Sequence, residues 1–465
     1  MKRIVWILGA VAATLAVLVA QQTDFTVVLR KAGQLPALAV PDFRGDGQPG
    51  SFMPAFNQTL WSDLDGGGIF KMVPKGSYPL NVPQQLSDFK IPPADNTAAR
   101  SGQAPAGGGG LWMSDWSSPP TQANYATIGY AAVQNNLFVL RAWLVDLSIA
   151  DPAYAGAVAK TYIEPLDEAG ARKAAHEFAC DILQRFGSTC LFGTHIYFVR
   201  RSGTLKTPVA EIWTMDADGK NQRQLTHFNA LSDFPAVSPD GSKVAFTSWA
   251  HGSPEIFVYS TAEQPRDLRF YNQRGASVTA SPSFTPDGKQ IVFQSSVGGC
   301  CGVYIANLDG SNVHAITTSR SNDAEPKVNP KTGAEIAFSS GRSGPEQLYR
   351  MNIDGTDVER LTDGTGEASN PSWHPDGQFL AYAWTRGFMA GAFNIFVMNV
   401  ARRDYIQLTH GEGKNENPSW APDGKHLVFM SDRTGRPQIW TMLADGTQKQ
   451  QLTTEGSNLH PVWGK

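Results

Sequence analysis

The most constraining feature of this sequence is a hairpin motif that recurs through its C-terminal part. In the copy spanning Asn417–Arg433, a proline and a tryptophan precede the turn Pro422–Gly424, and the apolar run Leu427–Phe429 follows it. Proline presets φ for a turn, and glycine adopts the positive φ that other residues resist. A continuous apolar run is typical of a strand covered on both faces. Each copy therefore predicts two strands joined by a tight turn.

The motif recurs at a spacing that identifies the architecture. Its first proline occurs six times, at steps of 43 to 47 residues: Pro235, Pro282, Pro326, Pro371, Pro418 and Pro461. Further apolar strands such as Ile439–Met442 and short segments such as Gln451–Thr453 follow most copies, with Asp-Gly turns between them. Four strands per period of about 45 residues predict the blade of a β-propeller, and this turn chemistry argues against a helical solenoid.

The two ends of the repeat region predict how the ring closes. The last copy, His460-Pro461-Val462-Trp463, supplies only an innermost strand, while His195–Val199 reads as a second strand with no first strand before it. Pairing these two segments completes six blades and leaves no open sheet edge. We therefore expect a six-bladed β-propeller over residues 195–465, in a protein that is mostly β.

Residues 35–190 predict a smaller N-terminal α/β domain with a mixed sheet. Strands are expected at 35–43, 69–73, 125–133, 137–147 and 160–163, and helices at 52–64 and 167–186, with Gly187 as a helix terminator. The glycine-rich stretch 94–110 is expected to be a mobile surface loop. His176 lacks the second histidine of a metalloprotease motif, so we expect no catalytic centre in this domain.

The N-terminus predicts export. Met1–Arg3 is basic, and the 17 residues Ile4–Ala20 are uncharged and apolar, which is typical of a secretory signal peptide over residues 1–20. Seventeen apolar residues are also near the lower limit for spanning a bilayer, so an uncleaved membrane anchor is the alternative. Residues 21–34 follow as a separate N-terminal extended segment.

The four cysteines are compatible with an oxidising compartment. Cys180 and Cys190 lie ten residues apart around the expected end of a helix and could form a disulfide. Cys300 and Cys301 are adjacent, and a strained vicinal disulfide and two free thiols are both compatible with that spacing. Neither pair has the partners of a zinc site, and we expect no metal and no cofactor.

Charge excludes one class of partner. The formal net charge is −3, and charged residues make up only 17% of the chain. A nucleic-acid-binding protein of this size would carry a basic stripe or patch. We therefore expect no nucleic-acid partner.

Taken together, the repeats and the order of the N-terminal segments resemble the TolB family, the periplasmic member of the Tol–Pal system. The repeats follow the pattern P-x-[WF]-x-P-D-G, with [LI]-Y-x-M and D-G-x-x-x-x-x-L-T between them. Leu38–Phe43, Tyr125–Tyr130, Leu144–Asp146 and His195–Phe198 occur in the family's order. The resemblance covers essentially the whole mature chain and implies a monomeric, non-enzymatic periplasmic adaptor.

The resemblance also implies two partners and a role in outer-membrane integrity and cell division. A Pal-type peptidoglycan-associated lipoprotein would bind at one propeller mouth, and a TolA-type inner-membrane protein would bind the N-terminal segment. The carried-over segment residues are Asp24, Phe25, Thr26, Val27, Val28, Leu29 and Arg30. On loops entering the innermost strands, the resemblance implies Val278, Ser281, Ala324 and Glu325, and the repeat adds Asp233, Asn370, Asn417 and His460.

Two other classes of function remain as alternatives. A channel-mouth enzyme would need converging groups, for which the candidates are His227, His314, His410, His460, Glu325 and Glu416. The chain contains no G-x-S-x-G elbow of a serine hydrolase. A carbohydrate- or peptidoglycan-binding propeller would need exposed aromatic rings at Trp373, Trp420 and Trp463, whose place in the repeat instead predicts packing between blades.

Overall fold

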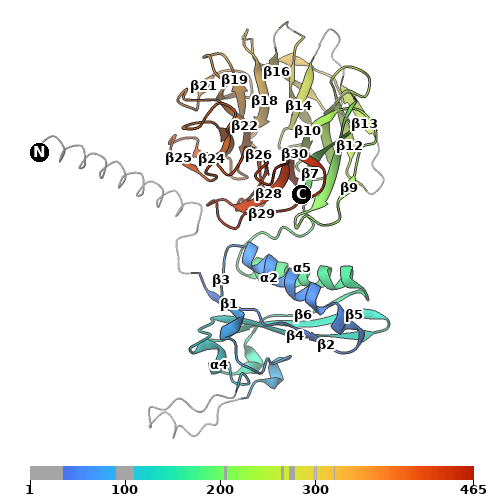
Figure 1. Cartoon of the computed structure of the whole chain (residues 1–465), viewed down its shortest axis with the longest axis vertical. Helices are drawn as coiled ribbons and strands as arrows, with labels where there is room; N and C mark the ends of the chain where they lie inside the picture. The colour runs from blue at the N-terminus through green and yellow to red at the C-terminus, as the bar shows by residue number, and fades with distance from the viewer. Residues whose placement is uncertain are drawn as a thin grey trace, which may run out of the picture. The chain divides into compact units, whose positions relative to one another are not determined.

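The computed structural model describes residues 35–90, 109–203, 207–262, 267–271, 278–297, 299, 301–318 and 320–465. The chain divides after Phe192 into two compact units (Figure 1). The expected signal peptide, the extended segment 21–34 and nearly all of the glycine-rich loop lie outside the described residues. Within the described ranges, no helix is both long enough and apolar enough to cross a membrane.

The N-terminal unit is built on a mixed sheet with the strand order β3-β1-β4-β5-β6, with β2 pairing alongside β4. The strands are β1 (Ala37–Ala39), β2 (Arg44–Gly45), β3 (Lys71–Met72), β4 (Tyr125–Gln134), β5 (Leu137–Asp146) and β6 (Gly156–Pro165). β1 runs parallel to β3 and β4, whereas β4, β5 and β6 form an antiparallel meander. Asn135 and Asn136, with φ of 52° and 60°, form the tight turn between β4 and β5.

Two strands of this sheet are shorter than the apolar runs that predict them. β1 ends at Ala39 because the next backbone groups bond to side chains: Val40 N donates to Tyr78 Oη at 2.8 Å, and Phe43 N donates to Asn57 Oδ1 at 2.8 Å. The run at 69–73 contributes only β3. Strand β6 is longer than expected, because its residues pair along nearly the whole of β5.

Two long helices pack on one face of the sheet and a short helix lies on the other (Figure 1). The helices are α2 (Met53–Gly66), α5 (Glu168–Arg185) and α4 (Met113–Ser117), with 3₁₀ turns at η1 (Gln48–Ser51), η2 (Lys75–Ser77), η3 (Leu86–Asp88) and η4 (Pro152–Tyr154). Phe56 of α2 and Phe178 of α5 are fully buried with Phe138 of β5 in the larger core. Trp116 of α4 centres the core on the opposite face.

Helix α5 shows how local sequence sets its ends. Asp167 caps the N-terminus by accepting from Gly170 N at 2.7 Å. Gly187 follows the C-terminus with φ 72°, and Ser188 N donates to Leu183 O at 2.9 Å, which is a Schellman ending. A disulfide joins Cys180, within α5, to Cys190, which follows the helix. The second expected cysteine pair includes Cys300, which lies outside the described residues.

The C-terminal unit is the expected six-bladed propeller. It consists of six four-stranded sheets, each antiparallel and, except in the first blade, in chain order. Blades 1 to 6 are numbered along the chain from β7 (Figure 1).

The strands of each blade run from the innermost to the outermost. Blade 1 is β30 (Ser457–Gly464), β7 (His195–Gly203), β8 (Pro208–Asp216) and β9 (Arg223–Gln224); blade 2 is β10 (Ser232–Val237), β11 (Lys243–Ser248), β12 (Glu255–Ser260) and β13 (Asp267–Tyr271); blade 3 is β14 (Thr279–Phe284), β15 (Gln290–Ser295), β16 (Gly302–Asn307) and β17 (His314–Ala315). Blade 4 is β18 (Asp323–Val328), β19 (Glu335–Ser340), β20 (Gln347–Asn352) and β21 (Glu359–Arg360); blade 5 is β22 (Ala368–Trp373), β23 (Phe379–Trp384), β24 (Asn394–Asn399) and β25 (Tyr405–Gln407); blade 6 is β26 (Asn415–Trp420), β27 (His426–Ser431), β28 (Gln438–Leu443) and β29 (Gln450–Gln451).

Blade 1 is closed by the two ends of the propeller, as the repeat count predicts. The C-terminal strand β30 lies beside β7 (Figure 1), with Leu459 opposite Val199 and Trp463 opposite Ile196. The indole Nε1 of Trp463 donates to Thr194 Oγ1 at 2.9 Å. The first and last segments of the ring are therefore held together by a backbone ladder and by a buried side chain.

Neighbouring blades are joined by apolar packing. Leu427, Val428 and Phe429 of β27 are fully buried, which confirms that this second strand is covered on both faces. Trp373, Trp420 and Trp463 are only 5–7% exposed and belong to the interior. All three border the central cavity of the propeller, but rings so little exposed are poor stacking platforms for a sugar, which weakens the alternative of a carbohydrate-binding propeller.

The recurring Leu-Thr sequence has a structural role at the outer edge of the blades. In blade 6, Ile439 N donates to Thr453 Oγ1 at 2.9 Å, and that hydroxyl donates to Gln438 Oε1 at 2.6 Å. The same bond from a third strand to a threonine hydroxyl recurs in blades 1, 3, 4 and 5, at Thr226, Thr317, Thr362 and Thr409. The threonine continues the hydrogen bonding where the short outermost strand ends.

Removal of residues 457–465 tests the closure. This deletion takes away all of β30 and leaves β7 with an open edge, so we expect the propeller to lose its cooperative thermal transition. Deletion of Lys465 alone is the control, since that residue lies beyond β30. An unchanged thermal midpoint in the longer deletion would show that the ring does not depend on this pairing.

Candidate functional site

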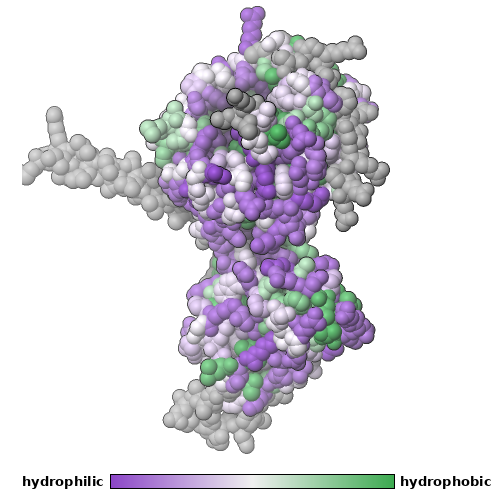
Figure 2. Space-filling model, turned by 45° about the vertical axis from the view of Figure 1, so that its right-hand side comes forward, coloured by the Kyte–Doolittle hydropathy of each residue, from purple (hydrophilic) through white to green (hydrophobic). Residues whose placement is uncertain are grey.

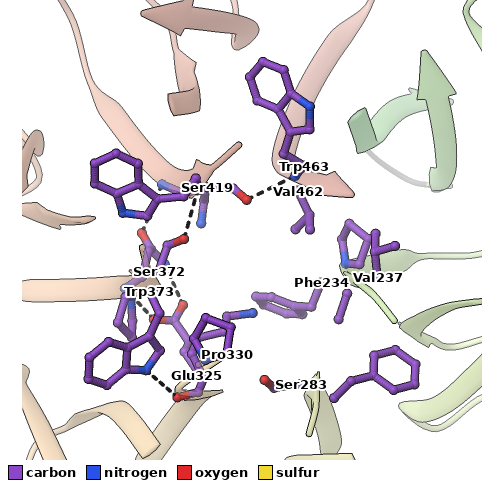
Figure 3. Close-up of a pocket in the computed structure, with 18 of the residues that line it drawn as sticks. Phe234, Val237, Ser283, Glu325, Pro330, Ser372, Trp373, Ser419, Val462 and Trp463 are labelled. Carbon is purple, nitrogen blue, oxygen red and sulfur yellow. Dashed lines mark hydrogen bonds between the residues drawn. The ribbon is translucent and has the colours of Figure 1, made fainter. Parts of the chain in front are cut away.

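The innermost strands of the six blades enclose a cavity of about 290 Å³. Each blade contributes residues from its Pro-containing strand, and Figure 3 shows Phe234, Ser283, Glu325, Ser372 and Ser419 arranged around the open centre. The residues that line the cavity therefore come from equivalent positions of the repeat. This is the propeller mouth that the sequence singles out.

Every innermost strand carries a β-bulge at its proline. In blade 6, Glu416 pairs with Met430 and Ser419 with Val428, so β26 advances by three residues while β27 advances by two. The same shift occurs in all six blades. Proline has no N–H to donate and occurs in sheets at edges, strand starts and bulges. Pro418 is thus the fourth residue of its strand, and the bulge accommodates it there.

The residue before each proline adopts a left-handed backbone conformation. These six residues are Phe234, Ser281, Glu325, Asn370, Asn417 and His460, with φ between 43° and 55°. Asparagine tolerates this region, whereas phenylalanine, glutamate and histidine adopt it rarely. Because the conformation recurs at all six bulges, the propeller architecture imposes it, and it turns these residues toward the cavity that they line.

Five of the eight expected mouth residues line this cavity, and three do not. Ser281, Glu325, Asn370, Asn417 and His460 do so, and they lie within strands rather than on the loops where we expected them. Asp233 was expected at the repeat position, but that position belongs to Phe234, because Phe234 is the residue before Pro235.

The two other exceptions have structural positions. Ala324 is 8% exposed and pairs with Ser339 within the sheet of blade 4. Val278 precedes β14, and its backbone N–H donates to Ser296 Oγ at 2.9 Å. The expected N-terminal segment, Asp24–Arg30, lies outside the described residues.

Hydrogen bonds link the mouth residues of three consecutive blades. The Glu325 carboxylate accepts from Asn370 N at 2.7 Å, from Asn370 Nδ2 at 2.6 Å and from Ser339 Oγ at 3.0 Å. Asn370 Oδ1 in turn accepts from Asn417 N at 3.4 Å. Side chains and backbone of blades 4, 5 and 6 are thus fixed relative to one another at the mouth.

An ionisable pair links blade 1 to blade 2 on the other side of the mouth. His460 Nδ1 contacts Asp233 Oδ1, and the His460 ring stacks on Phe234 with centroids 4.8 Å apart. Burial opposes a charge on the His460 imidazole, but the Asp233 carboxylate outweighs it, with a contribution from Glu325 and opposition from Arg201, so the pKa of His460 is raised. Asp233 therefore acts on the mouth through His460.

Two of the histidines considered for a channel-mouth enzyme lie in different parts of the propeller. His460 lies in β30, whereas His314 lies in the exposed outer strand β17. Across the described ranges, no three His, Cys, Asp or Glu side chains are placed to hold a metal ion.

A lysine that sequence reasoning missed also lines the mouth. Lys327 follows Pro326 in β18, and the equivalent residues of blades 3, 5 and 6 are Ser283, Ser372 and Ser419. Burial lowers the pKa of Lys327, while the nearby Glu325 carboxylate opposes that shift. The signal was present in the repeats as Pro-Lys in one copy against Pro-Ser in three others.

Glu346 also has a shifted pKa: burial, Glu325 and Glu367 raise it to about 7.

The backbone strain at the mouth predicts a specific response to mutation. Asn417→Val places a β-branched residue at φ 52°, and we expect it to cost about 1–2 kcal/mol of unfolding free energy, measured by urea denaturation. The Asn417 side chain makes no hydrogen bond among the described residues, so the change isolates the backbone. Asn417→Gly is the matched control and should differ little from the native protein. Equal stability of the two variants would contradict an imposed left-handed conformation.

The His460–Asp233 pair predicts a pH dependence of stability. Since the folded pKa of His460 is raised, its contribution is fully present below the unfolded pKa near 6.5 and is lost as the pH rises through the folded pKa. The difference in unfolding free energy between the native protein and His460→Gln should therefore shrink between pH 6 and pH 9. His314→Gln, at an exposed position, is the control and should show no such trend. A constant difference across this range would refute the pairing.

The comparisons with known proteins agree with this architecture. The family described as the TolB beta propeller domain matches residues 185–389 and 363–465, which together span more than half of the chain. A protein TolB homolog from Chlorobaculum tepidum is 29% identical over 303 residues, covering 64% of this chain and 60% of that protein. The Tol-Pal system protein TolB from Gluconobacter oxydans is 28% identical over 263 residues, covering 56% and 49%. A protein TolB homolog from Chlorobium luteolum is 32% identical over 174 residues, or 37% of each chain.

These alignments span less than two thirds of the length of the curated relatives. The fold similarity extends further. The crystal structure of TolB from Acinetobacter baumannii superposes with a TM-score of 0.73 over 93% of this chain and 97% of that chain, at 21% identity. The TolB propeller domain matches more than half of the sequence, and the chain carries the six-fold repeat of a propeller; this chain therefore belongs to the TolB family.

Proposed function

We propose that this protein is a non-enzymatic periplasmic adaptor of the Tol–Pal system. Its curated relatives include proteins named Tol-Pal system protein TolB, and the proposed export signal, Met1–Ala20, would deliver it to the periplasm. A Pal-type outer-membrane lipoprotein would bind at the propeller mouth, and a TolA-type inner-membrane protein would bind the segment Asp24–Arg30. In this role the protein supports outer-membrane integrity and cell division.

The observation that carries this proposal is the pre-organised mouth. The hydrogen bonds from Glu325 through Asn370 to Asn417 fix polar groups of three blades before any partner arrives. A surface that is already ordered loses little conformational entropy on binding, which favours docking of a folded partner. The face of the propeller seen in Figure 2 is mostly hydrophilic. This is compatible with reversible docking, because non-obligate interfaces are no more apolar than the rest of a protein surface.

The two proposed partners use different parts of the chain, and this separation gives the proposal a mechanism. Occupancy of the mouth by one partner could be reported to the other by ordering or releasing the N-terminal segment, since segments that order on binding are common in signalling. The adaptor would then connect an outer-membrane and an inner-membrane protein without any chemical step.

Paired binding measurements test the proposal. Asn417→Arg introduces bulk and charge at the mouth, and we expect it to weaken binding of a purified Pal-type lipoprotein at least tenfold, or about 1.4 kcal/mol, by calorimetry. Deletion of residues 22–33 should abolish capture of the TolA-type protein and leave the lipoprotein affinity unchanged. Val358→Arg, at a 41% exposed position near the outer strand β21, is the control for both. Lipoprotein binding that survives Asn417→Arg would exclude this mouth as the docking face.

A further inference from the structure

A second ring of residues in the propeller mouth differs in chemistry from the residues that precede the prolines. It consists of the residues that follow the prolines, one from each blade, which we call the donor ring: Val462, Ala236, Ser283, Lys327, Ser372 and Ser419, in blade order 1 to 6. All six line the cavity. Their order around the ring places four polar residues on consecutive blades and two apolar residues on the remaining two.

Each of the three serines of this ring accepts one hydrogen bond and has its own hydrogen available. Ser283 Oγ accepts from Val328 N of the next blade at 3.2 Å. In the same way Ser372 Oγ accepts from Trp420 N at 3.3 Å and Ser419 Oγ from Trp463 N at 3.1 Å (Figure 3). A hydroxyl that accepts in this way still has one hydrogen to donate. In the part of the chain that the structure describes, no acceptor takes these hydrogens.

Lys327 replaces serine at the corresponding place in blade 4. Its backbone carbonyl accepts from Trp373 Nε1 at 2.9 Å, but its ammonium makes no hydrogen bond or ion pair with any described residue. Glu325 is the nearest carboxylate by sequence and offsets part of the cost of burying the charge. It makes no hydrogen bond or ion pair with the ammonium among the described residues, and instead accepts from three donors of Asn370 and Ser339. An ammonium has three donors and no acceptor, and its burial is unfavourable unless an anion or acceptor compensates it.

We propose that the donor ring is an anion-binding site that takes a carboxylate. The ammonium of Lys327 and the hydroxyls of Ser283, Ser372 and Ser419 form an arc of hydrogen-bond donors, and a carboxylate is an acceptor with two oxygens. Val462 and Ala236, on the two remaining blades, give the aliphatic part of such a ligand an apolar surface.

The size of the cavity is compatible with this ligand. A volume of about 290 Å³ admits an acidic side chain or a chain terminus together with several waters, each of which takes about 30 Å³. The carboxylate could belong to a free small acid or to a segment of a docked protein. The site itself does not depend on the proposed adaptor role, because a small carboxylate tests it without any partner protein.

Sodium acetate is the first probe, titrated against the full-length protein at constant ionic strength with sodium chloride as the balancing salt. We expect the thermal midpoint of the propeller to rise with acetate concentration and to saturate, since a ligand that binds only the folded state stabilises it. Lys327→Ser restores the residue that three other blades carry, so we expect this variant to fold. Its apparent acetate affinity should fall at least tenfold, as expected for loss of a charge-assisted hydrogen bond.

A control variant makes the result decisive. Lys289→Ser removes a lysine from the turn between β14 and β15, outside the cavity, and its acetate response should match that of the native protein. If Lys327 serves only to balance the Glu325 charge, then Lys327→Ser will lower stability and acetate will have no effect on either protein. That outcome, or an equal acetate response in Lys327→Ser and the native protein, would overturn the proposal.

Peptides distinguish the source of the carboxylate once acetate binding is established. Three short peptides of the same length are compared by competition with acetate: one with a central Asp and blocked ends, the same with Asn, and the Asn peptide with a free C-terminus. Tighter binding of the first indicates an acidic side chain, and tighter binding of the third indicates a chain terminus. Competition by neither peptide indicates a site for a free small carboxylate.

Discussion

The pairing of β30 with β7 is the interaction on which the rest of the propeller depends. It joins residues more than 250 positions apart in the sequence, so its formation requires the intervening blades to be in place. In return, it removes the open sheet edge that each incomplete ring would expose. The buried Trp463 and its bond to Thr194 anchor this strand to the segment where the propeller begins. Closure also brings His460 against Asp233, so one end of the chain completes the mouth.

The β-bulge at each proline connects this architecture to the candidate site. Proline and the residue before it together face a single residue of the second strand. The residue before the proline takes a left-handed conformation. This geometry directs one set of side chains into the cavity and leaves the next residue of the strand, serine in three blades, to accept an N–H from the neighbouring blade. The same local device therefore builds the ring and furnishes its mouth. Lys327 differs from its equivalents, because in three other blades the residue at this position is a serine that bonds to the next blade.

Several mouth residues differ from their expected positions. Asp233 was expected at the mouth, but the residue directly before Pro235 is Phe234, so Asp233 lies one residue before the repeat position. The mouth residues were expected on loops, because a proline fits the first residue of a strand, where it need not donate to the ladder. In the structure the prolines lie within the strands, at a β-bulge. The family resemblance implies Ala324 as a mouth residue, yet Ala324 pairs with Ser339 and is buried within the sheet.

The sequence by itself determined the number of blades, the closure of the ring and the membership of the TolB family. The physical reason is that turn chemistry and apolar runs are local properties, and their repetition at a nearly constant step is typical of a ring of similar blades. Only the tertiary structure decided which side chains meet at the mouth. The link from Glu325 to Asn370, the contact of His460 with Asp233 and the donor arc around Lys327 all join residues from different blades. Such contacts depend on how each bulge orients its strand in the closed ring, which no single repeat specifies.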